Sequence, residues 1–237
     1  MEISQKIVVV TGASSGLGAA LASSLVAKGA KVYGLARNLD ELKALQSHLG
    51  KAFTPIGMDI TDQKAIASWV EGTFSEHLAP DILINNAGAG YFSKIDELPL
   101  EKWHAMINTN LNGTFYITSK IVPYMKQSLA TCHIINIGSI LGKITRVEST
   151  AYSATKFGLL GFSEALYKEL CADKIKVTCV NPGSIDTHFF EDSGIKRHHN
   201  MLQPKDIAEL VIHILETPDN LLVDEITLRP LMQNPPV

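Results

Sequence analysis

Two segments of the chain place a tyrosine four residues before a lysine. Tyr152 and Lys156 lie in "AYSATKFG", and Tyr116 and Lys120 lie in "FYITSKIV". Residues four apart share one face of a helix, so in both segments an ammonium group would lie near a phenol. A phenol beside a positive charge can transfer a proton, whereas the same pair on a solvated helix face only packs or pairs locally. The surrounding elements must decide which of the two pairs takes part in chemistry.

The bulk composition favours a single globular domain over residues 1–237. The chain has 46% hydrophobic and 19% charged residues, and no linker or low-complexity segment divides its sequence. Its net charge of −3, with basic residues scattered singly, gives no reason to expect nucleic acid or an anionic membrane as a partner. The first apolar run, "IVVV", is too short for a signal peptide or a membrane span. We therefore expect a cytoplasmic protein whose partner is a small molecule.

The cysteines and the paired histidines do not form a metal-binding pattern. Cys132, Cys171 and Cys179 lie in apolar stretches without the spacing of a metal site, and we expect buried free thiols. His198 and His199 are adjacent, and no acidic or cysteine partner lies at a helical interval from them in the sequence. We therefore expect no bound metal.

Seven apolar segments rich in valine and isoleucine recur along the chain. Their hydrophobicity is nearly continuous, as in parallel strands covered on both faces. They are 6–11, 31–36, 52–58, 81–86, 133–138, 176–181 and 224–229. Segments with helical spacing lie between them, and we expect Gly29 to follow the end of one helix and Asp62 to cap the start of another. The alternation predicts an α/β fold with one parallel sheet, right-handed crossovers and helices on both faces.

In such a sheet, ligands bind outside the carboxyl ends of the strands. The first strand runs into "TGASSGLG", where Gly12, Gly16 and Gly18 lie at the start of a helix. Glycines allow a tight turn and a close approach of backbone N–H groups to a phosphate, and the helix N-terminus adds partial positive charge. A glycine pattern alone is also typical of a structural turn. Its place between the first strand and the first helix favours a site for the phosphates of a dinucleotide.

The end of the second strand, "LARN", bears on the choice of cofactor. An acidic side chain there would accept hydrogen bonds from the 2′-hydroxyl of the adenosine ribose. This chain has Ala36 at that place, followed by Arg37 and Asn38. A guanidinium group suits a phosphate, so the segment favours NADP over NAD, with Arg37 and Asn38 near the 2′-phosphate. The alternative is that Arg37 is a surface residue at the start of a loop.

The third and fourth strands also end in residues that suit a nucleotide. Asp59, in "MDI", can accept a hydrogen bond from the adenine amino group or can cap the following helix. "NNAG", 85–88, ends the fourth strand with two asparagines that favour a turn. Its small Ala87 and Gly88 would let the backbone lie along a ribose. We assign both roles to the NNAG segment and leave the role of Asp59 open.

The fifth and sixth strands separate the two tyrosine–lysine pairs. The fifth strand brings Ser139 to the same edge of the sheet, and the helix of Tyr152 and Lys156 follows. The sixth strand then ends in "NPGSIDT", another loop at this edge. Nothing comparable surrounds the other pair in the sequence. We therefore predict that Tyr152 and Lys156 are the chemical pair, and that Tyr116 and Lys120 pack or pair on a helix surface.

With these motifs in order, the chain resembles the classical short-chain dehydrogenases/reductases. The motifs are "TGASSGLG", "DI", "NNAG", "NTN", "NIGS", "YSATK" and "NPGSIDT", and the resemblance covers residues from Lys6 to about Arg229. It implies a single Rossmann-type, doubly wound domain with a seven-stranded parallel sheet, and a nicotinamide cofactor, here NADP(H). It also implies a homodimer or homotetramer formed through two long helices, about 101–128 and 152–172. Apolar residues such as Phe157 on the second helix support that expectation.

The resemblance further implies a catalytic tetrad of Asn110, Ser139, Tyr152 and Lys156. Ser139 would hydrogen-bond the substrate oxygen, and Tyr152 would exchange a proton with it. A phenol has a pKa of about 10, and we expect Lys156, helped by an oxidised nicotinamide, to lower it by about two to three. By the same resemblance, Asn110 kinks its helix and anchors a water that leads protons to Lys156. The alternative is an asparagine on the helix surface.

The family's motifs, matched to this chain, imply a set of cofactor contacts at the strand ends, with Thr187 at the nicotinamide carboxamide. These residues are Gly12, Ser14, Ser15, Gly16, Leu17, Gly18, Arg37, Asn38, Asp59, Ile60, Asn86, Ala87, Gly88, Tyr152, Lys156, Pro182, Gly183, Ile185 and Thr187.

Residues beside the tetrad are expected to face the substrate, together with the segment 188–200, which looks like a lid. These residues are Ala89, Gly90, Tyr91, Ile140, Leu141, Thr145, Arg146 and Val147. Lys143 and Arg146 could bind a carboxylate on the substrate, or they could be solvated loop charges. The closing segment "DEITLRPLMQ" is similar to the end of the NADP-dependent 3-hydroxy acid and serine dehydrogenase branch of the family.

The working hypothesis is an NADP-dependent oxidoreductase acting on a small or medium carbonyl or secondary alcohol substrate, a hydroxy acid being favoured. One alternative is a 3-oxoacyl thioester (acyl-carrier-protein) reductase. An alternative of another class is a non-catalytic regulator that senses NADPH. The complete tetrad argues against the regulator, because a sensor has no chemical need for those four residues.

Overall fold

The computed structural model describes residues 1–187, 189 and 199–231. In this part of the chain, seven parallel strands form one sheet in the order β3-β2-β1-β4-β5-β6-β7. The strands are β1 Ile7–Thr11, β2 Lys31–Ala36, β3 Phe53–Gly57, β4 Ile82–Asn85, β5 Cys132–Ile137, β6 Ile175–Pro182 and β7 Glu225–Leu228. All seven predicted strand segments are confirmed, because buried apolar runs in an α/β chain pair as central parallel strands.

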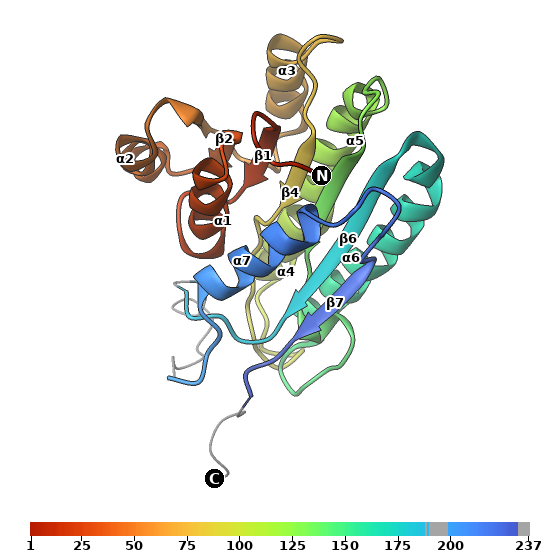
Figure 1. Cartoon of the computed structure of the whole chain (residues 1–237). Helices are drawn as coiled ribbons and strands as arrows, with labels where there is room; N and C mark the ends of the chain where they lie inside the picture. The colour runs from red at the N-terminus through yellow and green to blue at the C-terminus, as the bar shows by residue number, and fades with distance from the viewer. Residues whose placement is uncertain (188, 190–198, 232–237) are drawn as a thin grey trace.

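Helices cover both faces of the sheet, as predicted (Figure 1). They are α1 Gly16–Ala27, α2 Leu39–Leu49, α3 Gln63–Thr73, α4 Leu100–Ile107, α5 Thr114–Met125, α6 Thr150–Leu170 and α7 Pro204–Leu215. One apolar core lies under α1, α2 and α7, and α1 and α7 run side by side there (Figure 1). A second core lies on the opposite face, under α3, α5 and α6. Two separate cores on one sheet are what the doubly wound arrangement requires.

Two helix ends are formed by the residues predicted for them. The Asp62 side chain accepts hydrogen bonds from the backbone N–H groups of Lys64 and Ala65, both at 3.0 Å, and so caps α3. Gly29 follows α1 with a left-handed φ of 85°, and its N–H donates to Val26 O at 2.9 Å. Both ends satisfy backbone groups that the helix itself leaves unpaired.

The predicted helix 101–128 is interrupted in its middle. Between α4 and α5 the backbone forms a π-helical turn, Asn108–Gly113, which contains the predicted tetrad member Asn110. Such turns widen a helix locally and occur frequently at functional sites. This change in helix geometry lies at the residue for which a kink was expected.

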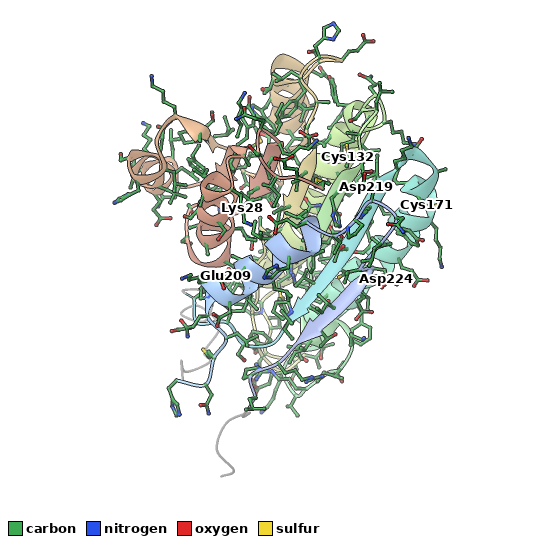
Figure 2. The ribbon with its side chains drawn as sticks, viewed as in Figure 1. Lys28, Cys132, Cys171, Glu209, Asp219 and Asp224 are labelled. Atoms are coloured by element: carbon green, nitrogen blue, oxygen red, sulfur yellow. The ribbon has the colours of Figure 1, made fainter. Side chains whose placement is uncertain are left out.

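The prediction of buried thiols is wrong for one cysteine. Cys132 and Cys179 lie in β5 and β6 and are buried, but Cys171 is exposed because it begins the turn Cys171–Asp173 that follows α6 (Figure 2). In the described ranges, no group of three or more histidine, cysteine or acidic side chains could hold a metal ion. Within the same residues, no helix has the length and apolar character needed to cross a membrane.

Candidate active site

The loop between β1 and α1 forms a cradle of bare backbone. Gly12 has a left-handed φ of 65°, and a Cβ on it would lie 2.9 Å from the Cα of Ala87. A Cβ on Gly18 would overlap the carbonyl oxygen of Gly12. In the described structure, the side chain of Ser15 at the N-cap of α1 makes no capping hydrogen bond, so it leaves the N–H groups of the first turn to another acceptor. This loop fits the phosphates of a dinucleotide.

The end of β4 is hydrogen-bonded directly to this loop. Asn86 Nδ2 donates to the carbonyl oxygens of Thr11 and Gly12, at 3.0 and 3.1 Å. The hydroxyl of Thr11 accepts from the backbone N–H groups of Asn86 and Ala87, both at 3.0 Å. The turn expected for the NNAG segment is thus held against the glycine loop by side chains from both strands.

The next residue, Gly88, connects the glycine loop to the predicted tetrad. The position that a Cβ would take on Gly88 is 3.5 Å from Asn110 Oδ1 and 3.9 Å from Lys156 Nζ. On the other side of the loop, Thr187 Cγ2 lies 3.0 Å from the corresponding position on Gly16. The strand ends that carry the glycine loop, the NNAG segment, the tetrad and Thr187 therefore meet at one edge of the sheet.

Asn110 is almost fully buried, which rules out the alternative of a helix-surface asparagine. Its side-chain oxygen accepts from Ala89 N at 2.8 Å, and its amide nitrogen donates to Ala89 O at 2.9 Å and to Thr155 Oγ1 at 2.9 Å. Asn110 lies in the π turn, where the hydroxyl of Thr114 donates to its backbone carbonyl at 3.1 Å. Asn110 thus links the segment after NNAG to the helix of Tyr152 and Lys156.

Tyr152, Ser139 and Lys156 form a compact buried group. Burial raises the pKa of the Tyr152 phenol to about 12, and a hydrogen bond with Ser139 acts in the opposite direction. Lys156 Nζ donates to Ile137 O at 2.8 Å and lies 5.7 Å from the centre of the Tyr152 ring. Burial lowers the pKa of Lys156 to about 8. In the protein without a nicotinamide, burial therefore sets the direction of the Tyr152 pKa shift, and the lowering expected from Lys156 together with an oxidised nicotinamide stays a prediction.

Two phenylalanines enclose Tyr152. The rings of Phe92 and Phe189 lie 5.2 and 6.0 Å from the Tyr152 ring, centre to centre. Apart from Phe189, His199 and Asn200, the predicted lid 188–200 lies outside the described residues. Phe189 belongs to the segment that was expected to face the substrate, but Phe92 was not predicted, because an aromatic residue in a loop carries no spacing signal of its own. Proximity of Phe92 to the NNAG segment was the available hint.

The two basic residues after Ser139 have different surroundings. Lys143 forms an ion pair with Glu225, with 2.6 Å between Nζ and Oε1. The guanidinium carbon of Arg146 lies 4.5 Å from the centre of the Phe92 ring, and so remains near the site. Arg146 is therefore the better candidate for binding a substrate carboxylate, because it stacks on Phe92, which contacts Tyr152. Lys143 is paired with Glu225.

At the expected adenosine end, the predicted residues follow β2 and β3. Arg37 and Asn38 are exposed, and Asn38 also caps α2 by accepting from Glu41 N at 3.2 Å. Asp59 Oδ1 accepts from the N–H and hydroxyl of Thr61, at 2.9 and 2.8 Å. The alternative that Asp59 caps α3 is therefore wrong, since Asp62 does so. Its role toward adenine stays a prediction.

The remaining predicted contacts line the same edge in different ways. Ser14 is half-buried and Ser15 is exposed, so their hydroxyls are accessible. The side chains of Leu17 and Ile60 pack into the two cores, which leaves their backbone for a ligand. At the end of β6, Pro182 is buried, the N–H of Gly183 donates to Leu228 O at 2.8 Å, and Ile185 forms an isolated β-bridge with Leu202.

The other tyrosine–lysine pair lies away from this edge, as predicted. Tyr116 packs against the second core, and its ring is 6.1 Å from that of Phe115. Lys120 pairs with Glu71 of α3, with 3.8 Å between Nζ and Oε1. This pair packs and pairs on the helix surface, as expected, and the choice of Tyr152 and Lys156 as the chemical pair stays a prediction.

The geometry defines what the candidate site can do. A protonated phenol and a serine hydroxyl can together bind one carbonyl or alcohol oxygen, and the phenol can give it a proton. A protonated Lys156 can stabilise the phenolate that this leaves. The adjoining glycine cradle can hold the phosphates of the cofactor.

Comparison with known proteins agrees with this geometry. Residues 6–197 match the family model described as short chain dehydrogenase. An uncharacterized oxidoreductase of Staphylococcus saprophyticus is 37% identical over 98% of this chain and 100% of its own length. A serine dehydrogenase in its closed form, complexed with NADP+, is 30% identical, with a TM-score of 0.88 over 93% of each chain. A 3-ketoacyl-(acyl-carrier-protein) reductase from Brucella melitensis, complexed with NADH, is 26% identical, with a TM-score of 0.88 over 97% of this chain and 98% of its own.

Proposed function

The chain belongs to the short chain dehydrogenase family of oxidoreductases, and we propose that it transfers a hydride between NADP(H) and a carbonyl or secondary alcohol. The proposed substrate is of small or medium size, with a hydroxy acid favoured. The observation that carries the proposal is the buried group of Tyr152, Ser139 and Lys156 at the same sheet edge as the glycine cradle. We propose Asn110 as the fourth member of this tetrad.

In the reducing direction, the bound cofactor supplies the hydride. Ser139 donates a hydrogen bond to the substrate oxygen, and Tyr152 gives that oxygen a proton. Because burial raises the pKa of Tyr152 to about 12, the phenol carries this proton at neutral pH. Lys156, whose pKa burial lowers to about 8, is largely protonated at pH 7 and stabilises the phenolate that remains. Asn110 holds Ala89 and Thr155 in place around this group.

Arg37 supports the choice of NADP(H). Ala36 ends β2 at the place where NAD-selective proteins carry an acid, and the exposed guanidinium of Arg37, the next residue, suits a 2′-phosphate. The serine dehydrogenase binds NADP+ and the 3-ketoacyl reductase binds NADH, so both cofactors occur among similar structures.

Arg37→Ala should weaken NADPH binding about tenfold, equivalent to about 1.4 kcal/mol, and leave NADH binding unchanged. Titration calorimetry with both cofactors measures the two effects. Lys51→Ala, which removes an exposed positive charge beyond α2, should change neither affinity. Equal losses for NADPH and NADH would contradict a role for Arg37 at the 2′-phosphate.

The similarity to a serine dehydrogenase supports a hydroxy acid substrate, as does Arg146 beside Phe92. A second candidate is a 3-oxoacyl thioester, since the 3-ketoacyl reductase has the same TM-score. The test is NADPH consumption with ketones, aldehydes, keto acids and a 3-oxoacyl thioester, and NADP+ reduction with the matching alcohols. Turnover of the acids supports the first candidate, and turnover of the thioester the second. Tight NADPH binding without turnover across the panel would favour the sensing regulator.

The assembly and location of the protein are also proposals. Phe115 on α5 and Phe157 on α6 are 53% and 45% exposed, which supports an apolar contact between copies of the chain. We propose a homodimer or homotetramer, to be tested by light scattering of the purified protein. The cytoplasmic location is to be tested by fractionation of cells.

A further inference from the structure

We propose that Glu225 is a positioning residue for Ser139, acting through Asn181 and Lys143. Glu225 is the first residue of β7 and pairs in register with Cys179 of β6. In Figure 2 the labelled Asp224 marks this start of β7, and Asp224 Oδ1 accepts from Glu225 N at 2.8 Å. The inference rests on the proposed function, since Ser139 matters for turnover only if the site acts as described.

The first connection runs through Asn181, which is fully buried at the end of β6. Asn181 Oδ1 accepts from the backbone N–H of Ser139 at 3.3 Å, and Asn181 Nδ2 donates to Glu225 Oε1 at 3.1 Å. An ionised carboxylate only accepts hydrogen bonds, whereas an amide group can present either a donor or an acceptor. Glu225 therefore favours the orientation in which the Asn181 amide nitrogen faces β7 and its oxygen faces Ser139, where Cys179 Sγ also donates to that oxygen at 3.4 Å.

The second connection runs through Lys143, at the far end of the same loop. The turn Ile140–Gly142 follows Ser139, and the N–H of Gly142 donates to Ser139 O at 2.9 Å. Lys143 comes next, and its Nζ lies 2.6 Å from Glu225 Oε1. One carboxylate thus holds both the beginning and the end of the segment 139–143.

The local packing requires this arrangement of Asn181. A Cβ on Gly138, the residue before Ser139, would overlap Asn181 Oδ1, so the glycine lets the amide lie against the backbone. The side chains of Lys143 and Glu225 are 43% and 30% exposed, so solvent screens their ion pair. The buried amide is therefore expected to carry more of the effect than the exposed ion pair.

The variant that tests this is Glu225→Gln, which keeps the length of the side chain but lets it present a donor to Asn181. We expect kcat to fall about tenfold, equivalent to about 1.4 kcal/mol of transition-state stabilisation, with NADPH affinity unchanged. Hydrogen exchange of the 138–143 backbone, followed by mass spectrometry, should become several-fold faster because the Ser139 N–H loses its ordered acceptor.

A matched control exists on the other side of the molecule. Glu216, after α7, forms an ion pair with Lys28, labelled in Figure 2, with the same 2.6 Å separation and with 47% and 35% exposure for the lysine and glutamate side chains. Glu216→Gln removes one negative charge of similar exposure, and should leave both kcat and the exchange of 138–143 unchanged. A general effect of charge removal would appear equally in both variants.

A double variant separates positioning from a purely structural role. If Glu225 acts through Ser139, Glu225→Gln should cause no further loss of kcat in a Ser139→Ala background. Additive losses would overturn the inference, as would a wild-type kcat with unchanged exchange in Glu225→Gln. If the wild type turns over no substrate, the proposed function fails instead. The exchange measurement then still decides whether Glu225 orders the segment 138–143.

Discussion

The two edges of the sheet each bury a lysine, and the two lysines have different surroundings. Lys156, at the carboxyl edge, is 5% exposed, and Lys176, at the amino edge near the start of β6, is 7% exposed. Burial lowers the pKa of both. Lys176 Nζ donates to Pro218 O and Leu221 O, both at 2.6 Å, and so holds the loop between α7 and β7. In Figure 2 the labelled Asp219 lies in that loop.

Lys156 has fewer partners among the described residues. Its Nζ donates to Ile137 O, and its other neighbours are the Tyr152 ring and the backbone of Gly88. A buried cation is therefore not a sign of chemistry by itself. The informative difference is that Lys176 is surrounded by carbonyl oxygens that consume its donors, while Lys156 adjoins a phenol and a bare backbone cradle.

The amino edge also buries a histidine. The hydroxyl of Thr178 donates to Val223 O at 2.6 Å, so it must accept from His133 Nε2, which lies 2.7 Å away. Within the part of the chain that the structure describes, His133 Nδ1 has no hydrogen-bond partner. Burial, followed by the charge of Lys176, lowers the pKa of His133 to about 3. The buried groups of the amino edge therefore hold the fold together with His133 neutral, whereas the carboxyl edge is the one that we propose for proton transfer.

The largest expected effect comes from the carboxyl edge. Tyr152→Phe removes the proton donor and should lower kcat about 1,000-fold, within the usual range for general acid catalysis. NADPH affinity and the free energy of unfolding should change little, because the ring and its contacts with Phe92 remain. Steady-state kinetics, calorimetry and urea unfolding measure the three quantities. A variant that keeps a third of the wild-type kcat would remove Tyr152 from the mechanism.

Replacing each lysine by methionine tests the comparison directly. Lys156→Met should lower kcat about 100-fold or more, because the phenolate loses its positive neighbour. It should destabilise the fold less than Lys176→Met does, since only Ile137 O loses a charged donor. Lys176→Met should leave kcat per folded molecule unchanged but destabilise the fold by about 2–3 kcal/mol, since two carbonyl oxygens lose a charged donor. Steady-state kinetics and thermal unfolding of both variants measure the two effects. An equal loss of activity, or an equal loss of stability, would contradict the division between the edges.

The smallest effect is a pH dependence of stability at the amino edge. The unfolded chain binds a proton at His133 below pH 6.5, whereas the folded chain does not until about pH 3. Stability is therefore lost as pH falls below 6.5, by up to about 1.4 kcal/mol per pH unit, or about 2 kcal/mol between pH 7 and pH 5.

His133→Gln keeps a donor for Thr178 without titrating, so its stability should fall less over this pH range than that of the wild type. The exposed His213 provides the control, since His213→Gln should keep the wild-type slope. Urea unfolding at pH 7 and pH 5 gives the free energy of unfolding of the wild type and of each variant at both pH values. Equal slopes for wild type and His133→Gln would show that this histidine titrates normally.

Much of the carboxyl edge was predictable because its features are local. The strands follow from continuous apolar runs, and the Gly12–Gly18 loop from its place between a strand and a helix. The choice of Tyr152 over Tyr116 followed from the flanking strand ends. The partners of Lys156 and Asn110 were not predictable, because Ile137 O and Ala89 are backbone groups that any residue could supply.

Features that depend on contacts between distant segments were missed. Glu225 lies 86 residues after Ser139, and nothing in either segment alone indicates that Asn181 joins them. The pKa of Tyr152 depends on how completely neighbouring side chains exclude water, which spacing does not reveal. Cys171 was assigned to the interior because its neighbours are apolar, whereas the helix end that carries it faces solvent.

The sequence by itself determined the order of elements and the glycine cradle, because hydrophobic period and local backbone requirements act over a few residues. It also indicated which tyrosine to propose for the chemistry. Tertiary structure alone decided the charge states and the hydrogen-bond partners of the buried groups. Desolvation and hydrogen-bond geometry arise between segments distant in the chain, and they exist only once the sheet has brought its strand ends together.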